Sequence, residues 1–267
     1  MSYIKFSFAN VVDGATITGS SEDADYPASN IANPERPFLP WRTTAITDQN
    51  VVIDFTTTTQ LSLIILVRTN FAAATIQGNA TNTWGAPSYS QAVTIARNPV
   101  MWRYQYAILP VGFNYRYLRI FIPAQTPVDG ASYFLLGGVW AGATLTPPKN
   151  FLLQVEYEAL EPKRDLQPDH SGWRQRLVLG EPVCVMRTRR MAEVSFIRRR
   201  ATPFVDDQLQ DWMDLDRQMR DADYFGLFLN NDDPSQGYVM RRVSDAQWAH
   251  SRRTRAESQF DLEEVIR

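Results

Sequence analysis

The sequence predicts a mainly β protein in two parts: a β-sandwich (jelly roll) at residues 1–146 and an α+β part at residues 147–267. Three observations support this prediction. Short runs rich in β-branched and aromatic residues alternate with turn residues over the first part. One segment alone carries a helical period over several turns. The composition changes at residues 144–150, TLTPPKN, where two consecutive prolines favour an extended connector between domains.

The first part contains seven strand-like runs. They lie at Val51–Phe55, Leu61–Val67, Ala74–Ala80, Val93–Ala96, Tyr104–Leu109, Tyr115–Ile122 and Tyr133–Val139. Turn signals separate several of them, at residues 85–87, 98–99 and 129–130. The run at residues 115–122 alternates as a half-buried strand does, which puts Tyr115, Tyr117, Arg119 and Phe121 on one face. The N-terminal part is therefore expected to be a sandwich of short strands.

The second part mixes strands with one helix. Strands are expected at residues 176–179, 183–187, 193–198, 224–229, 237–243 and 259–266. A helix is expected at Phe204–Arg220, because apolar residues recur there at the spacing that builds one face. Acidic residues in its first turns suit the helix dipole. The economical prediction is one helix on a small antiparallel sheet or barrel.

Composition narrows the function classes. The 267-residue chain has a formal net charge of −2, so it has no overall electrostatic bias towards nucleic acid or membrane. Cys184 is its only cysteine, which excludes an intrachain disulfide, and two histidines are too few for a structural zinc site. No signal peptide is recognisable, and the longest apolar run is too short to span a membrane. Synthesis in a cytoplasm is expected.

No catalytic signature is present, so the sequence predicts no enzyme, no catalytic residue, no cofactor and no metal site. The chain lacks a phosphate-binding loop, a dinucleotide fingerprint, a histidine metal motif and a nucleophile elbow. Both histidines, His170 and His250, lie in polar segments that are expected to be exposed. Carboxylate pairs are plentiful, but the sequence does not place two of them across one cleft, as a glycosidase requires.

Aromatic residues suggest a glycan contact. Trp84, in NTWGAPS, reads as a loop-tip residue and is the first candidate, with Tyr89 and Trp102 beside it in sequence. Indole and phenol rings can stack on the apolar faces of sugars. The competing interpretation is that these rings belong to the core or to a subunit interface, where tyrosine and tryptophan are enriched.

Arginine runs suggest a subunit interface at Arg198, Arg199, Arg200, Arg241 and Arg242. The planar guanidinium pairs bidentately and tolerates interfaces. Nucleic-acid binding is the weaker interpretation, because acidic stretches flank each run and a nucleic-acid-binding domain would normally be basic.

Two blocks resemble proteins of tailed bacteriophages. The block YPASNIANPERPFLPWRTT, followed by NVVIDF and SLIILVRTNFAAATIQGNA, resembles the galactose-binding-like (discoidin-type) jelly rolls of tail and baseplate proteins. The block WRQRLVLGEPVCVMRTRRMAEVSFIRR, with YFGLFLNNDDPSQGYVMRRV and the final FDLEEVIR, is similar to a second piece of tail architecture. Distal tail proteins place the ring-forming domain first, and the order here is the reverse.

The resemblance implies a structural component of a phage baseplate or tail tip, located in the virion. Its partners would be other tail proteins (tube, hub and fibres), with a homo-oligomeric ring of three- or six-fold symmetry. The alternative is a receptor-binding, lectin-like module that recognises a host surface glycan. A glycan depolymerase ranks below both, and neither nucleic acid nor a membrane span is expected.

Overall fold

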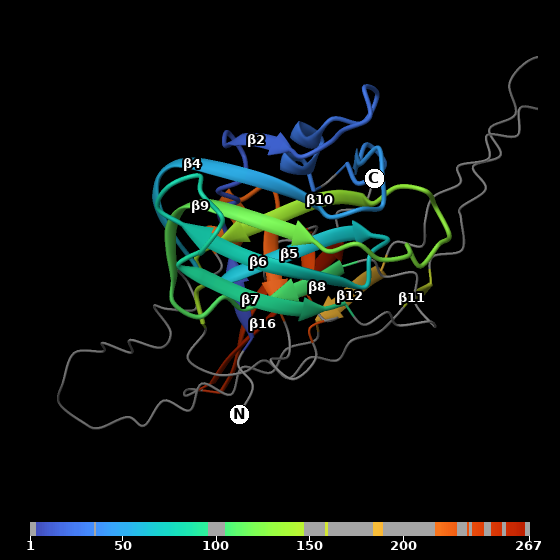
Figure 1. Cartoon of the computed structure of the whole chain (residues 1–267). Helices are drawn as coiled ribbons and strands as arrows, with labels where there is room; N and C mark the ends of the chain where they lie inside the picture. The colour runs from blue at the N-terminus through green and yellow to red at the C-terminus, as the bar shows by residue number, and fades with distance from the viewer. Residues whose placement is uncertain are drawn as a thin grey trace, which may run out of the picture.

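The computed structural model describes residues 4–34, 36–95, 105–146, 158–159, 184–188, 217–228, 234, 237–242, 247–252 and 255–264. Within these ranges the protein is mainly β, as predicted, and its strands pair in three antiparallel sheets. Two of the sheets form the N-terminal sandwich (Figure 1).

The first sheet of the sandwich has five strands in the order β2-β4-β9-β6-β7. Their bounds are β2 Thr16–Gly19, β4 Gln49–Leu61, β9 Phe113–Ile122, β6 Ala73–Asn79 and β7 Tyr89–Thr94. β9 lies between β4 and β6, so residues of three separate segments meet on each face of the sheet centre. Figure 1 shows these strands side by side across the front of the sandwich.

The second sheet has four strands in the order β3-β10-β5-β8. Their bounds are β3 Trp41–Arg42, β10 Leu135–Gly142, β5 Leu63–Thr69 and β8 Gln105–Ile108. Every residue of β10 is buried, and all but one of β5. A strand buried on both faces needs a continuous apolar run, which explains the sequence LIILV in β5.

The sandwich core fills the space between these two sheets. β4 contributes Val51, Ile53 and Phe55, and β9 contributes Leu118, Ile120 and Ile122. Residues two apart share one face of a strand, so the residues between them point out of the sandwich. The alternation in β9 thus divides core side chains from surface side chains.

The Pro- and Asn-rich segment before β4 closes one end of the sandwich. It includes the 3-10 helix η1 (Ala28–Ala32) and ends at Trp41, which is fully buried. The Trp41 indole donates to the Ser21 carbonyl at 2.9 Å. Gly138 permits the close approach of this segment, since a Cβ there would meet the Cα of Pro34 at 2.5 Å. Trp41 is therefore structural.

The third sheet joins the first strand of the chain to the C-terminal part. Its order is β1-β13-β14-β16-β12-β11, and β15 also pairs with β16. The bounds are β1 Lys5–Ser7, β11 Glu158–Ala159, β12 Cys184–Thr188, β13 Phe225–Phe228, β14 Gly237–Arg242, β15 Gln247–Arg252 and β16 Arg255–Glu264. β1 pairs with β13, with Lys5 opposite Phe228. Strand pairing thus crosses the predicted boundary at residues 146/147, and the boundary itself stays a prediction.

The third sheet covers the outer face of the four-stranded sheet. A separate apolar cluster joins Leu63, Ile65, Val67, Ala107 and Trp140 to Phe228 and Val239. Glycines allow this close packing: a Cβ on Gly226 would meet the Trp140 indole nitrogen at 2.6 Å. The described residues of the two parts therefore share a core.

The described strands match the predicted runs closely, and the strands predicted at residues 176–179 and 193–198 lie outside the described ranges. In the first part every predicted run overlaps a strand, although Leu61 ends β4, the next strand starts at Leu63, and Ala96 and Tyr104 lie outside the described residues. Five strands were not predicted: β1, β2, β3, β11 and β15. The first three are short and owe their extended form to their partners. Of the predicted helix, residues 217–220 are helical, the turn continues to residue 221, and residues 204–216 lie outside the described ranges.

Candidate functional site

The outer face of the five-stranded sheet carries a row of polar and aromatic side chains. Register places Arg119 of β9 beside Gln77 of β6 on one side and Val52 of β4 on the other. Phe121 is the next outward-facing residue along β9, and it lies opposite Thr75 of β6. The core residues alternate with these positions, so the whole row faces away from the core. We call Gln77, Trp84, Tyr117, Arg119 and Phe121 the β9 face.

Arg119 is the centre of the β9 face. Its Nε donates to Gln77 Oε1 at 2.6 Å. Its guanidinium carbon lies 4.6 Å from the centroid of the Trp84 ring and 5.4 Å from that of Phe121. Partial burial lowers the pKa of Arg119 from its usual value, yet an arginine stays charged at neutral pH. The side chain is a fixed cation between two aromatic rings.

Trp84 reaches Arg119 from the loop between β6 and β7. The loop, residues 80–88, has bends at residues 85 and 86, as the turn signal there predicted. The Trp84 indole donates to Asn82 Oδ1 at 2.7 Å, and its side chain is half-buried. The guanidinium covers one face of the ring, which leaves the partly exposed indole a second face for another ring-shaped group.

Asn79 holds the loop in place. Its side chain is 8% exposed. Its Nδ2 donates to the Thr83 carbonyl at 2.7 Å, while its Oδ1 accepts from the Ala80 amide at 2.9 Å and from the Ser88 hydroxyl at 3.1 Å. One buried amide therefore ties both ends of the loop that carries Trp84.

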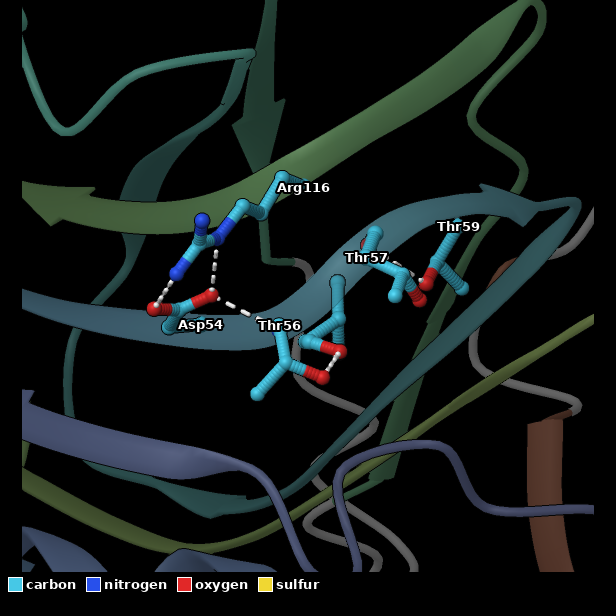
Figure 2. Close-up of polar contacts among 6 residues, drawn as sticks. Asp54, Thr56, Thr57, Thr59 and Arg116 are labelled. Carbon is cyan, nitrogen blue, oxygen red and sulfur yellow. Dashed lines mark hydrogen bonds and ion pairs between the residues drawn. The ribbon is translucent and has the colours of Figure 1, made fainter.

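An ion pair lies next to the β9 face. Arg116 of β9 donates to both carboxylate oxygens of Asp54 on β4, from Nε at 2.7 Å and from Nη2 at 2.8 Å (Figure 2). The hydrogen bonds from Arg116 lower the pKa of Asp54 to about 2, although partial burial opposes this shift. Asp54 is therefore ionised and its charge is already neutralised.

Asp54 also fixes a bulge in β4. Its Oδ1 accepts from the Thr56 amide at 2.7 Å, and Figure 2 shows this contact at the start of a run of threonines. The pairing with β9 shifts register between Asp54 and Thr59. Thr56 has a φ of 65°, a strained conformation for a β-branched residue, which the bulge and the Asp54 contact impose.

The other sequence-predicted glycan contacts lie elsewhere. Tyr89 opens β7 and turns towards the core, with its ring edge-on to Phe113 at 5.4 Å. Burial raises the pKa of its hydroxyl. Trp102 lies outside the described residues. The structure thus brings Trp84 to an open face and places Tyr89 at the rim of the core.

The predicted interface arginines fall mostly outside the described ranges. Arg198, Arg199 and Arg200 lie there, and so does His170. Arg241 and Arg242 belong to β14, where register places them opposite Glu263 and Leu262 of β16. Their part in a subunit interface stays a prediction.

No group of three or more His, Cys, Asp or Glu residues in the described ranges could hold a metal ion. None of the helical segments that the structure describes is long and apolar enough to cross a membrane.

Part of the β9 face could be predicted from the sequence. The alternation in β9 predicted that Tyr117, Arg119 and Phe121 share a face, and NTWGAPS predicted a loop-tip Trp84. The meeting of Trp84 with Arg119, 35 positions later, depends on the pairing of β6 with β9 and has no local signal.

Comparison with known proteins gives low-scoring similarities of fold. No family model matches the chain, and no curated protein matches it. A fucose-binding module from Streptococcus pneumoniae is 12% identical, with a TM-score of 0.41, over 51% of this chain and 98% of that module. A histidine mutant of the lectin-binding domain of lectinolysin, in complex with Lewis b, is 10% identical, with a TM-score of 0.42, over 51% of this chain and 97% of that domain.

A chitosan-binding module of a Paenibacillus chitosanase/glucanase is 17% identical, with a TM-score of 0.40. It is matched over 54% of this chain and 100% of its own length.

Proposed function

We propose that this chain is a receptor-binding, lectin-like protein that recognises a surface glycan with the β9 face and catalyses no reaction. The observation that carries the proposal is the position of Trp84: a half-buried indole held over an open sheet face, beside polar groups, and away from the core. Core and interface tryptophans usually lose their exposure, as Trp41 and Trp140 do here.

The chemistry of the face suits a saccharide. A pyranose ring presents an apolar face that can stack on an indole and hydroxyls that need hydrogen-bonding partners. Trp84 supplies the aromatic plane, and the Gln77 amide and the Arg119 guanidinium supply donors a few ångströms away. A small number of placed polar groups around an aromatic surface is the usual composition of such sites.

The site is formed before any ligand binds. Sheet pairing fixes Gln77 and Arg119, and Asn79 fixes the loop of Trp84. A preorganised site loses little side-chain freedom on binding, which favours affinity.

The same face argues against glycan cleavage. Glycosidases use two carboxyl groups about 5–10 Å apart, one of which must be protonated. Among the described strands of this sheet, register places one carboxylate on the outer face, Asp54, and Arg116 keeps its pKa near 2. Such a group is a poor general acid at neutral pH, so we rank a depolymerase below a binding protein.

A glycan array with two matched variants tests the proposal. Trp84→Ala removes the proposed stacking platform. Phe38→Ala is the control, because Phe38 is also an exposed loop aromatic, 42% exposed, with an arginine (Arg68) 5.5 Å from its ring centroid. Phe38 lies at the opposite end of the sandwich, since its loop leads into β3 whereas the Trp84 loop follows the far end of β6.

The expected result is binding by the wild-type protein and by Phe38→Ala, and loss of at least about tenfold in affinity for Trp84→Ala, on the basis of the usual weight of a buried aromatic anchor. Equal binding by both variants, or no binding by a folded wild-type protein, would refute the proposal.

A second candidate function is assembly within a virion tail. The sequence resemblance to tail and baseplate jelly rolls suggests it, and the shared core of the sandwich and the third sheet fits a rigid assembly unit. In this proposal the arginines of β14 contact neighbouring subunits or other tail proteins in a ring, and the open β9 face points outward. Mass spectrometry of purified phage particles checks the location: a peptide of this chain in the particle is expected, and its absence would remove the tail role.

A further inference from the structure

We infer that the glycan recognised by the β9 face is acidic, and that Arg119 receives its carboxylate, sulfate or phosphate group while Trp84 stacks on the sugar ring. This inference rests on the proposed function and adds the chemical class of the ligand. It starts from a feature of the face that a neutral sugar leaves unexplained: a cation with no counter-charge in the part of the chain that the structure describes.

The Arg119 guanidinium pairs with no carboxylate among the residues that the structure describes. Its one hydrogen-bonding partner there is the neutral Gln77 side chain, and its other neighbours are the rings of Trp84 and Phe121. Partly burying a charge without an opposite charge is unfavourable. A bound anion would offset that cost.

The geometry leaves the correct atoms available. Gln77 occupies Nε, so the two Nη groups keep their donors for a ligand. A guanidinium recognises planar carboxylates and tetrahedral oxyanions through parallel N–H donors. The flanking rings hold the guanidinium plane, and therefore the direction of those donors, in place.

The neighbouring charges support an anionic ligand. The one carboxylate that register places on this outer face, Asp54, is bound by both Arg116 donors at 2.7 and 2.8 Å. Asp54 and Arg116 cancel each other, which leaves Arg119 as the net charge of the site. Among the described residues of this sheet face, the unbalanced charge is therefore positive, although the whole chain carries −2.

The test uses an array of paired glycans that share one backbone and differ only in an acidic group, namely a uronic acid against its hexose, a sialylated against an unsialylated chain, and a sulfated against an unsulfated one. The variants are Arg119→Gln, Arg119→Lys and, as a control that keeps the net charge, the double variant Asp54→Asn with Arg116→Gln. Circular dichroism and thermal unfolding verify that each is folded.

We expect the wild-type protein to prefer the acidic member of at least one pair, with affinity that falls as salt rises. Arg119→Gln should lose roughly 10- to 100-fold in affinity for that member, as a hydrogen-bonded charge does, and should lose clearly less for the neutral member, which has no charge for Arg119 to pair with. Arg119→Lys should recover part of the loss, and the double variant should change binding less than about threefold.

The outcomes separate the two proposals. Glycan binding that depends on Trp84 but does not distinguish acidic from neutral partners, or that survives Arg119→Gln, overturns the acidic ligand and leaves the lectin proposal standing. Absence of any glycan binding by the folded wild-type protein overturns both.

Discussion

The two outer faces of the sandwich differ in what covers them. The face of the four-stranded sheet, with Leu63, Ile65 and Trp140, lies beneath β13 and β14 of the third sheet. No strand that the structure describes covers the outer face of the five-stranded sheet, which carries arginine, glutamine and tyrosine among its aromatic residues. One face extends the core, and the other is available to a ligand.

The burial patterns of the strands that form each face show the same difference. β5 is buried at six of seven positions, because it contacts apolar side chains on both sides. β9 alternates, because one side contacts the core and the other side contacts solvent. Apolar runs therefore identify covered sheets, and alternation identifies the surface where function must be sought.

The covered face should be needed for folding. Trp140→Ala should lower the free energy of unfolding by about 3–5 kcal/mol, because a fully buried indole leaves a cavity between the sheets. Phe121→Ala, on the open face, should cost less than about 1 kcal/mol. Chemical denaturation of both variants measures the difference, and similar losses would show that the two faces are not distinct in the way described.

The hydrogen bonds by which Asn79 holds the Trp84 loop should contribute less to the free energy of unfolding. Asn79→Ala removes three hydrogen bonds of a buried amide and leaves the Thr83 carbonyl and the Ala80 amide without this partner. We expect a loss of about 1–3 kcal/mol in unfolding free energy, with faster hydrogen exchange in residues 80–88. Asn114→Ala, at an exposed position of β9, is the control. Unchanged exchange in residues 80–88 would show that Asn79 does not hold the loop in place.

The Asp54–Arg116 ion pair next to the β9 face should make the free energy of unfolding depend on pH. The pKa of Asp54 is about 2 in the folded protein and near 4 when the chain is unfolded, so its contribution is present above pH 4 and is lost as pH falls from 4 to 2. Because the pair is partly exposed, the effect should stay below about 1 kcal/mol. Unfolding measured across this pH range in Asp54→Asn should show a shallower dependence than in wild type, and an identical slope would contradict the assignment.

The binding residues themselves should matter least for stability. Trp84→Ala and Arg119→Gln should each change the free energy of unfolding by less than about 0.5–1 kcal/mol, since their contacts lie at the surface. Thermal unfolding checks this expectation. A loss as large as that of Trp140→Ala would indicate that the β9 face is structural, and that its loss of binding reflects unfolding.

The sequence predicted the fold class and most strands because local patterns encode them. The apolar run LIILV indicates a strand buried on both faces, and the alternation in YRYLRIFI indicates a strand buried on one face. Trp84 lies in a recognisable turn. Pairings between distant segments have no such signal. β1 joins β13 across more than 200 positions, and Trp84 meets Arg119 through the order of strands in a sheet. The site therefore appears only once β6 and β9 are known to be neighbours.

Hydrogen exchange with and without the tightest-binding array glycan shows whether the β9 face is the binding surface. We expect slowed exchange in β6, β9 and residues 80–88, with no change at residues 33–40 or in β10. Protection confined to the Phe38 loop or to the third sheet, with the β9 face unchanged, would contradict it.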